Sequence, residues 1–295
     1  MHSQLYIIIL NYNSATETVA LYHDLKNQTF TNFKTIVVDN KSSSKDLAIL
    51  KASIPNCNLR LLTTNKGYAS GNNHAIQEAI LNEIPFVLLL NPDIRLDYNC
   101  VENLIQVLLQ KQDVAAIGPR ICYREDPTLI YSDGGLIDLE KGLYTYHLNN
   151  NKTVDVVRYN SKLQSIDYVN GSACLVRTSV FEDIGLMRED FFLYFEETEW
   201  CMRATDNNYK LLTNIEAIAY HLSSQKGAMY HYYMTRNRLF LAKLYPAYYQ
   251  TTKNVIWKKL SKKLKKHLKT FSLPNASLKA QLKGYLAGRI KRITP

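Results

Sequence analysis

Three carboxylates lie within four positions of the stretch Tyr194 to Arg203, which reads YFEETEWCMR. Glu196, Glu197 and Glu199 stand among bulky apolar residues, where an ionised group is costly to bury unless it is paired or performs a task. One such task is general base catalysis, in which a carboxylate removes a proton from a hydroxyl group. The simpler alternative is that all three favour the positive end of a helix that begins near Glu197.

Such residues need a scaffold, and short apolar runs in the first 120 residues predict one. The runs begin about every 27 residues, and the stretches between them have helical periodicity. This rhythm is typical of βαβ units around a mostly parallel, buried sheet. The runs are LYIIIL from Leu5, FKTIVVD from Phe33, NLRLLTT from Asn58, FVLLL from Phe86 and VAAIG from Val114.

Polar residues follow directly after the first four runs. In an open α/β sheet, ligands bind beyond the carboxyl ends of the strands, so we expect these clusters to meet at one edge. They are Asn11 in NYN, Asp39 in VVDN, the segment Asn65 to Asn73 (NKGYASGNN) and Asp93 in NPD. Taken singly, Asp39 could cap the next helix and Asp93 could be a turn residue.

Two of these clusters say more about the ligand. Gly67 and Gly71 do not form a GxGxxG pattern, which argues against a dinucleotide-binding fold. Asp93 follows a buried run and is preceded by the stiff Pro92, so its carboxylate can reach a divalent cation. Such a cation takes its other ligands from a diphosphate and water.

The βαβ rhythm is lost between residues 120 and 165, where turn-rich, alternating sequence predicts hairpin strands. Apolar order resumes with YVNGSACLV from Tyr168, followed by a helix to about Asp206 and the strand LLTNIEAIAYHL. A helix from about Ala228 to Leu244 completes this part. Gly171 and Ser172 are small, as the floor of an acceptor site or a tight strand entry requires.

In combination, these motifs resemble the inverting, nucleotide-sugar-dependent family 2 glycosyltransferases, and most closely their bacterial rhamnosyltransferase-like branch. The resemblance runs in order from residue 5 to about 243, roughly four fifths of the chain. It implies the α/β GT-A fold, with helices on both faces of the sheet. The matching features are NYN, VVDNxS, NxGYASGNN, NPD in the DXD position, VNGSACLVR, the EExE stretch, His221 and YYMTRNR.

The resemblance implies a role for each matching position. Asp39 recognises the base of the donor nucleotide, Asp93 holds Mg²⁺ or Mn²⁺ against the diphosphate, and His221 is the second metal ligand. Glu197 is the general base, where relatives usually have aspartate. The remaining donor-binding positions are Asn11, Asn65, Gly67, Gly71, Asn72, Asn73 and Asn91. NPD keeps only the last acid of a DXD motif, so metal affinity should depend on the bound diphosphate.

Other residues near the predicted site have two interpretations. Glu199 could hold an acceptor hydroxyl or pair with Arg203 at i+4, while Glu196 could orient the loop on the acceptor side. Arg236 could face the donor diphosphate and offset charge on the leaving group. Alternatively, Arg236 and Arg238 are surface arginines that extend toward water.

The C-terminal part has a different charge from the rest. No Asp or Glu occurs after Glu216, so residues 217–295 carry a charge of about +17 and the preceding part about −7. Trp257, Leu260, Leu264, Leu268 and Phe271 share one helical face, and lysines cover the other. Leu278, Leu282, Leu286 and Ile290 indicate a second amphipathic helix. Such helices suit an anionic membrane surface, or else pack on the body or on a second subunit in a homodimer.

Length and cysteine content limit the remaining possibilities. The 295 residues suffice for a catalytic domain at 1–245, with a nucleotide-sugar-binding half at 1–120 and an acceptor-binding half at 121–245. A basic helical tail follows at 246–295. Five cysteines, no two within twenty positions, indicate a reducing compartment, and the short N-terminal apolar run is neither a signal core nor a membrane span. We expect a cytoplasmic protein, peripheral on the inner face of the membrane.

These features together predict an inverting glycosyltransferase of bacterial surface polysaccharide synthesis. By resemblance we expect the donor to be dTDP-rhamnose, or otherwise a UDP-hexose or UDP-N-acetylhexosamine, and the acceptor to be a lipid-linked glycan. Two alternatives remain, a catalytically silent nucleotide-sugar binder and a nucleic-acid-binding protein that uses the basic tail. The acidic body and the helical spacing of the tail aromatics argue against nucleic acid.

Overall fold

The computed structural model describes residues 4–223, 226–291 and 293. The chain divides into two compact units. The first contains Met1–Leu136, His147–Glu189 and Glu197–Ser223, and the second contains Ile137–Tyr146, Asp190–Glu196 and Ser224–Pro295. This division differs from the expected boundary at residue 245, because the helix at 228–244 packs with the two helices that follow it and belongs to the second unit.

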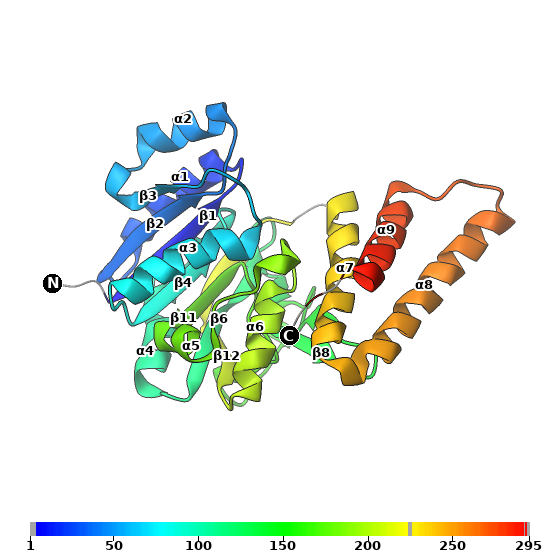
Figure 1. Ribbon diagram of the computed structural model, residues 1–295. Coiled ribbons are helices and arrows are strands. Elements are labelled where there is room, and N and C mark those ends of the chain that lie inside the picture. The colour runs from blue at the N-terminus through cyan, green and yellow to red at the C-terminus, as the bar shows by residue number, and fades with distance from the viewer. Residues whose placement is uncertain (1–3, 224–225, 292, 294–295) are drawn as a thin grey trace. The chain divides into compact units, whose positions relative to one another are not determined.

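Within the described residues, ten strands form one sheet and two form a separate pair (Figure 1). The strands are β1 Leu5–Asn11, β2 Phe33–Asp39, β3 Leu59–Leu61, β4 Phe86–Leu90, β5 Ile94–Leu96, β6 Val114–Tyr123, β7 Ile130–Ser132, β8 Gly135–Asp138, β9 Tyr144–His147, β10 Leu163–Ser165, β11 Ala173–Arg177 and β12 Lys210–His221. The main sheet has the order β10–β12–β6–β11–β4–β1–β2–β3, with β5 on β12 and β7 on β6, and β8 pairs with β9. All five predicted apolar runs form strands of this sheet.

The helices are α1 Ala15–Asp24, α2 Ser44–Ser53, α3 Tyr68–Leu81, α4 Cys100–Gln110, α5 Thr178–Ile184, α6 Glu196–Asp206, α7 Ala228–Leu244, α8 Tyr249–Lys269 and α9 Ala276–Ile290. Short 3₁₀ turns lie at Leu25–Asn27, Asn56–Asn58, Val154–Val156, Glu189–Phe191 and Pro246–Tyr248. The predicted helix at 228–244 has the expected bounds. The helix of the carboxylate cluster begins one residue earlier than predicted, at Glu196.

The sheet is parallel where the βαβ rhythm predicted it. β1 runs parallel to β2 and β4, β2 to β3, and β6 to β12. The strands outside this rhythm are antiparallel: β10 and β5 pair with β12, β7 pairs with β6, and β11 lies between β4 and β6, with Ala173 opposite Leu90. The residues just before β11 therefore lie at the carboxyl end of β4, which brings Gly171 and Ser172 to the ligand edge of the sheet.

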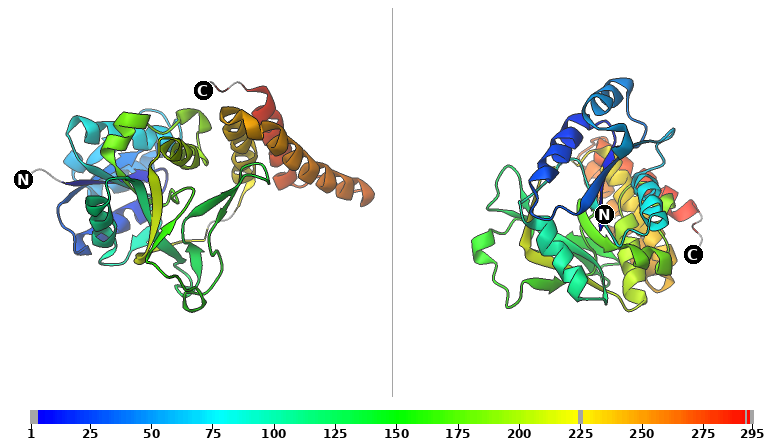
Figure 2. Two further views of the ribbon diagram at one scale, coloured as in Figure 1. Left: turned by 90° about the horizontal axis from the view of Figure 1, so that it is seen from below. Right: turned by 90° about the vertical axis from the view of Figure 1, so that its left-hand side faces the viewer.

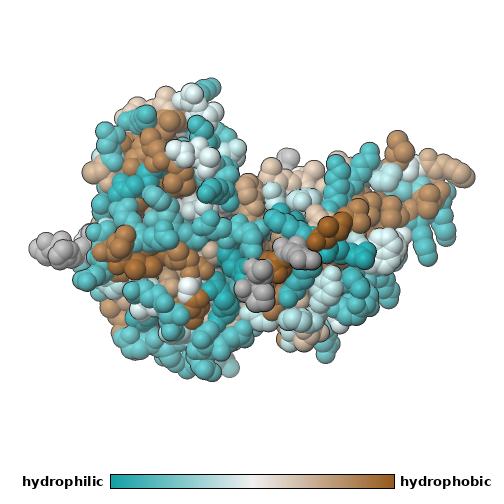
Figure 3. Space-filling model, viewed as in Figure 1, coloured by the Kyte–Doolittle hydropathy of each residue, from teal (hydrophilic) through white to brown (hydrophobic). Residues whose placement is uncertain are grey.

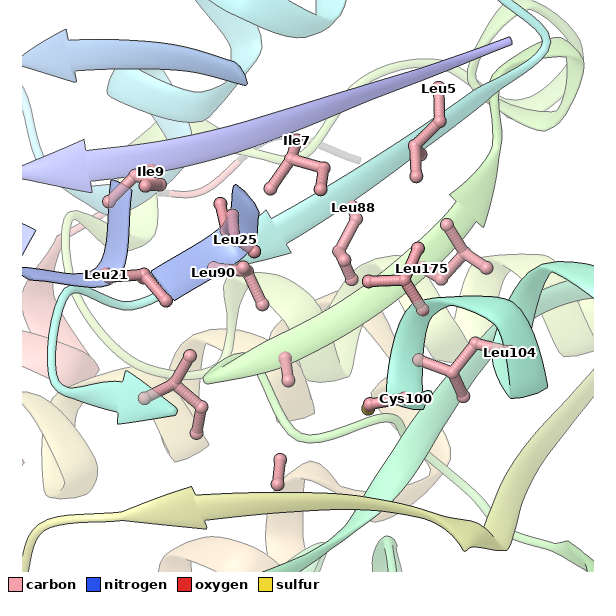
Figure 4. Close-up of a cluster of buried hydrophobic side chains, with 14 of the residues drawn as sticks. Leu5, Ile7, Ile9, Leu21, Leu25, Leu88, Leu90, Cys100, Leu104 and Leu175 are labelled. Atoms are coloured by element: carbon pink, nitrogen blue, oxygen red, sulfur yellow. The ribbon is translucent and has the colours of Figure 1, made fainter. Parts of the chain in front are cut away.

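The core on one face of the sheet consists of alternate strand residues covered by α1 and α4. Figure 4 shows Ile7, Leu88 and Leu175 on neighbouring strands, with Leu21 from α1 and Leu104 from α4 near them. All are fully or almost fully buried. Burial of an aliphatic side chain contributes about 1.5–3 kcal/mol, so this layer supplies much of the stability that holds the ligand edge in place.

The opposite face is covered by α3, which contacts β1, β2 and β4. Gly71 permits the close approach, since a Cβ at this position would lie 2.3 Å from Leu10 Cδ1. The GYASGNN segment therefore places a glycine where α3 packs on the sheet. The α/β fold with a mostly parallel sheet and helices on both faces is confirmed.

The second unit is built mainly from α7, α8 and α9, and Figures 1 and 2 show α8 and α9 as neighbouring helices. Two glycines of α9 allow it to lie against α7. A Cβ at Gly284 would lie 2.4 Å from the carbonyl oxygen of Tyr232, and one at Gly288 would lie 2.9 Å from Leu239 Cβ. The buried apolar residues between the helices are Leu239, Ile256, Leu260, Leu278 and Tyr285. Among the residues that the structure describes, no helix combines the length and apolar character needed to cross a bilayer.

We expect Gly284→Ala to lower the free energy of unfolding of the second unit by about 1–3 kcal/mol, the usual cost of overpacking. The new methyl would meet a backbone oxygen, which cannot rotate away as a side chain can. Urea unfolding followed by tryptophan fluorescence, to which Trp257 contributes from its stack on Tyr285 in the second unit, measures the effect. Gly227→Ala is the matched control, since a Cβ there meets nothing within 4 Å; equal midpoints for the two variants would contradict the close packing of α7 and α9.

Candidate active site

The carboxyl ends of β1 and β2 hold Asn11 beside Asp39, and both side chains are buried. Asn11 Nδ2 donates to Asp39 Oδ1 at 2.9 Å, and Asp39 Oδ2 accepts from the backbone N–H of Ser42 at 3.1 Å. The N-cap of α2 is Ser43, whose hydroxyl accepts from the N–H of Asp46. Asp39 is therefore a fixed acceptor at the sheet edge and does not cap this helix.

The start of α3 is held by asparagine side chains. Asn40 Nδ2 donates to Asn65 Oδ1 and to the carbonyl of Gly67, each at 3.0 Å, and Asn65 Oδ1 also accepts from the N–H of Gly67 at 2.9 Å. Gly67 has a φ of 103°, a backbone conformation that favours glycine. Gly67 is the N-cap of α3 and makes no side-chain cap, so the first N–H groups of this helix lack that acceptor and suit a phosphate.

Two asparagines of the same segment make contacts within the fold. Asn72 Nδ2 donates to the carbonyl of Tyr68 one turn earlier, at 3.1 Å. Asn73 Nδ2 donates to the carbonyl of Met187 at 2.8 Å and to Glu189 Oε1 at 3.2 Å. The structure thus places Asn73 as a link between α3 and the loop after α5.

Asp93 and His221 lie together, with Asp93 Oδ2 3.6 Å from His221 Nε2. His221 Nδ1 contacts the carbonyl of Leu222, which can only accept, and in the tautomer that donates to this carbonyl Nε2 has a lone pair. A carboxylate oxygen and an imidazole lone pair then face each other. Adjacent ligands on a cation with bonds of ~2.1 Å are about 3 Å apart, so this pair fits a divalent ion with a small shift.

Two residues that the sequence did not single out hold this pair in place. Arg124 is hydrogen-bonded to both residues. Its backbone N–H donates to the carbonyl of His221 at 2.9 Å, and its Nη1 donates to the carbonyl of Asp93 at 3.2 Å. The same Nη1 is 2.9 Å from Glu17 Oε2, and this contact helps to lower the pKa of Glu17 although burial alone would raise it. Tyr131 stacks on the His221 ring at a centroid distance of 4.8 Å. No spacing in CYRED or IYSDGG indicated these roles.

Glu197 lies beside the turn that precedes β11. A Cβ at Gly171 would lie 3.5 Å from both Cγ and Cδ of Glu197 and 3.6 Å from the hydroxyl of Tyr68. That hydroxyl donates to the carbonyl of Gly171 at 2.7 Å. The carboxyl group of Glu197, the backbone of Gly171 and the first residue of α3 thus meet at one point.

The same turn is bonded to the NPD segment. The N–H of Asn91 donates to the carbonyl of Ser172 at 3.0 Å, and Asn91 Nδ2 lies 3.2 Å from Ser172 Oγ. Asn170 Oδ1 accepts from the N–H of Ser172 at 2.9 Å and closes the turn. Hydrogen bonds therefore connect the surroundings of Glu197 to the residue two positions before Asp93.

Two buried thiols lie close enough to Glu197 to interact with it electrostatically. Burial raises the pKa of Cys174 well above its usual value, with smaller contributions from Cys201 and Glu197. Burial likewise raises the pKa of Cys201 to about 12, and the charges of Glu197 and Glu199 add to the shift. Both thiols stay neutral at pH 7, so they add no charge beside the carboxylate.

The other two carboxylates of the cluster have different surroundings. Glu199 is buried and pairs with Arg203, with 2.7 Å between Oε1 and Nε and 3.1 Å between Oε2 and Nη2. Arg203 in turn donates to the carbonyls of Ile184 and Leu186. Of the two interpretations of Glu199, the structure shows the i+4 ion pair. Glu196 belongs to the second unit.

Arg236 also belongs to the second unit, where it is buried. Its Nη2 donates to the carbonyl of Phe191, its Nε donates to Asn237 Oδ1 at 2.7 Å, and the guanidinium lies 4.6 Å from the ring centroid of Tyr233. Arg238 is half-buried and donates to the carbonyl of Gly142 at 2.7 Å. Neither is an arginine that extends into water, and the contacts of Arg236 organise the second unit.

The structure thus connects the first-unit candidates through three local groups: Asn11 with Asp39, Asn91 and Asp93 with His221, and Gly171 and Ser172 with Glu197. It engages Gly71, Asn72 and Asn73 in packing and hydrogen bonds of α3. Arg236 and Glu196 belong to the second unit and are not members of these groups.

Comparisons with known proteins identify relatives of this chain. The chain is 30% identical over 224 residues to the low-salt glycan biosynthesis hexosyltransferase Agl10 of Haloferax volcanii, covering 72% of this chain and 64% of that protein. It is 26% identical over 221 residues to the dTDP-rhamnosyl transferase RfbF of Shigella flexneri, covering 73% of this chain and 67% of that protein. The matches thus span about two thirds of the length of these relatives.

The fold is similar to that of the mannosyltransferase PcManGT from Pyrobaculum calidifontis, solved in complex with GDP-Man and Mn²⁺. The TM-score is 0.58 at 12% identity, and the match covers 97% of this chain and 86% of that chain. This likeness confirms the GT-A fold. The sequence model of glycosyl transferase family 2 matches residues 6–185, more than half of the chain. The chain belongs to glycosyl transferase family 2.

Proposed function

We propose that the protein is an inverting glycosyltransferase that moves a sugar from a nucleoside diphosphate donor to a hydroxyl group of a glycan. One observation carries the proposal: the carboxyl group of Glu197 lies against the Gly171 turn, which is hydrogen-bonded to the NPD segment, and the Asp93 of that segment lies beside His221. The proposed base and the pair proposed to bind the diphosphate are therefore both held next to the Gly171 turn. Neither a silent binder nor a nucleic-acid-binding protein needs this arrangement.

On the donor side, Asp39 accepts from the nucleotide base, and Asn11 keeps its carboxylate in place. The N–H groups at the start of α3 bind phosphate oxygens, with Asn65 and Gly67 shaping the turn. Asp93 and His221 would hold Mg²⁺ or Mn²⁺, and the ion would supply positive charge against the diphosphate. In the described residues no group of three or more His, Cys, Asp or Glu side chains is placed to hold a metal ion, so the donor diphosphate and water must supply the other ligands.

On the acceptor side, Glu197 removes the proton from the attacking hydroxyl, whose oxygen forms the new bond on the face opposite the leaving diphosphate. Gly171 and Ser172 line the approach, because any side chain at Gly171 would occupy the space next to the carboxyl group. Glu199 acts indirectly, by fixing Arg203 and the loop at 184–186.

The donor we propose is dTDP-rhamnose, supported by the similarity to the rhamnosyl transferase of Shigella flexneri. The acceptor we propose is a lipid-linked glycan at the inner face of the cell membrane, with the basic C-terminal helices on the anionic surface. Glycan synthesis is the role in the name of the Haloferax relative. The charge of about +17 over residues 217–295 supports the membrane location.

A thermal-shift panel of nucleotide sugars with Mn²⁺ tests the donor. We expect dTDP-rhamnose to raise the melting temperature more than UDP-glucose, UDP-N-acetylglucosamine or GDP-mannose, because a ligand at 100 times its Kd stabilises the folded state by about 2.7 kcal/mol. EDTA should reduce the shift. A larger shift with another nucleotide sugar would replace the proposed donor, and no shift with any of them would contradict the transferase itself.

A further inference from the structure

The end of the second unit where α8 passes into α9 exposes large apolar side chains. Leu268 is 74% exposed, Phe271 100% and Leu273 85%. They lie within six positions, on the last turn of α8 and in the connection to α9. We call these three residues the apolar tip. Apolar atoms are visible beside hydrophilic ones at the end of these helices in Figure 3.

Most other apolar residues of these helices pack within the unit, while Leu286 and Ile290 of α9 are also exposed, at 54% and 78%. Leu260 and Leu278 are buried with Leu239 of α7, and Leu264 and Leu282 pack against this cluster. The amphipathic face that the sequence predicts along α8 is therefore divided. Its first part joins the three helices, so α8 does not lie along a bilayer with its whole apolar face inserted. Its last part, the apolar tip, is the portion left for a partner.

The surroundings of the apolar tip are strongly basic. Exposed lysines occur before, within and after it, and no acidic residue follows Glu216. These lysines are Lys262, Lys265, Lys266, Lys269 and Lys279. A partner must therefore accept apolar side chains and carry negative charge at the same level. An anionic lipid bilayer has both properties, since its headgroups attract lysine and its acyl region receives leucine and phenylalanine.

Other partners fit these observations less well. A nucleic acid would use the lysines but would gain little from two exposed leucines and a phenylalanine outside any stacking surface. A second copy of the chain would bury the apolar tip, but a twofold contact there would also bring two sets of lysines together without acidic residues to offset them.

We infer that the apolar tip is the membrane anchor of the protein, with Leu268, Phe271 and Leu273 inserted among the lipids and the lysines at anionic headgroups. The membrane binding itself does not depend on the proposed function. Only its role, which is to bring the active site to a lipid-linked acceptor, rests on that proposal. The anchoring is shallow and reversible, because it uses three side chains and charge rather than a spanning helix.

Sedimentation of the full-length chain with vesicles tests the anchor. We expect binding to vesicles of phosphatidylcholine with phosphatidylglycerol, weaker binding at high salt, and little binding to phosphatidylcholine alone. The triple variant Leu268→Ser, Phe271→Ser and Leu273→Ser should bind anionic vesicles at least about 10-fold more weakly. The matched control changes two exposed apolar residues of the first unit, Leu81→Ser and Val156→Ser, and should bind like the unmodified chain.

Three results would overturn the anchor: unchanged vesicle binding by the triple variant, equal binding to charged and uncharged vesicles, or a dimer in sedimentation velocity that the triple variant loses. Preferential binding to DNA would likewise assign the basic surface to nucleic acid. Donor binding, measured by calorimetry on the same variant, should stay unchanged. Failure of donor binding in the unmodified chain would contradict the proposed function. It would not affect the anchor, which the vesicle experiment tests separately.

Discussion

Glu197→Gln should slow sugar transfer by about 10²-fold or more and leave donor affinity nearly unchanged. Glutamine keeps the size of the side chain beside Gly171 but cannot accept the acceptor proton, and loss of a general base costs a factor of this order. Single-turnover transfer with saturating donor measures the chemical step, and calorimetry measures the donor Kd.

Glu199→Gln is the matched control within the same helix. Its partner is Arg203, so we expect its main effect on thermal stability, because the substitution weakens a buried, bidentate ion pair. If Glu197→Gln keeps full activity, or if Glu199→Gln alone abolishes the chemical step in a stable protein, the assignment of the base to Glu197 is wrong.

Asp93→Asn should weaken Mn²⁺-dependent donor binding by about 10-fold or more. Asp93 supplies the negative charge of a two-residue metal site, and even changes to residues behind metal ligands cost 10–100-fold in metal affinity. Titration calorimetry with donor and Mn²⁺ measures the difference. In EDTA the unmodified chain should bind donor as weakly as the variant does.

Asp113→Asn provides the control for the loss of one negative charge. Asp113 is exposed, pairs with Lys210 at the surface and should not affect donor binding. Equal Mn²⁺-dependent affinity of Asp93→Asn and the unmodified chain would remove Asp93 from the metal site. Such a result would leave the contact with His221 as a purely structural one.

The sequence predicted the parallel part of the sheet because those strands are buried on both faces and separated by helices. It did not predict the direction of β11, since a buried apolar run such as ACLVR has the same composition in either direction. The sequence pattern also did not predict the second unit, because this unit depends on contacts between residues far apart in sequence. Arg238 donates to the carbonyl of Gly142, and Asn237 donates to the carbonyls of Phe191 and Leu193.

The candidate site divides along similar lines. The expectation that ligand-binding residues lie at the carboxyl ends of parallel strands predicted Asn11 near Asp39. These two residues end neighbouring parallel strands and are paired in register. Tyr68 and Arg124 act through backbone carbonyls, which have no signature in side-chain spacing. Gly71 matched a motif by residue type, but its close contact with Leu10 shows a packing requirement that only the fold reveals.

The discontinuous second unit constrains the order of events during synthesis. Its segments at 137–146 and 190–196 leave the ribosome well before α9, with which they share one unit. At ~5–20 residues per second, residue 291 follows residue 146 by roughly 7–29 seconds. The carbonyls of Gly142 and Phe191 are synthesised before their donors Arg238 and Asn237, which follow 96 and 46 residues later. A chain truncated after residue 223 would therefore lose these hydrogen bonds as well as its last three helices.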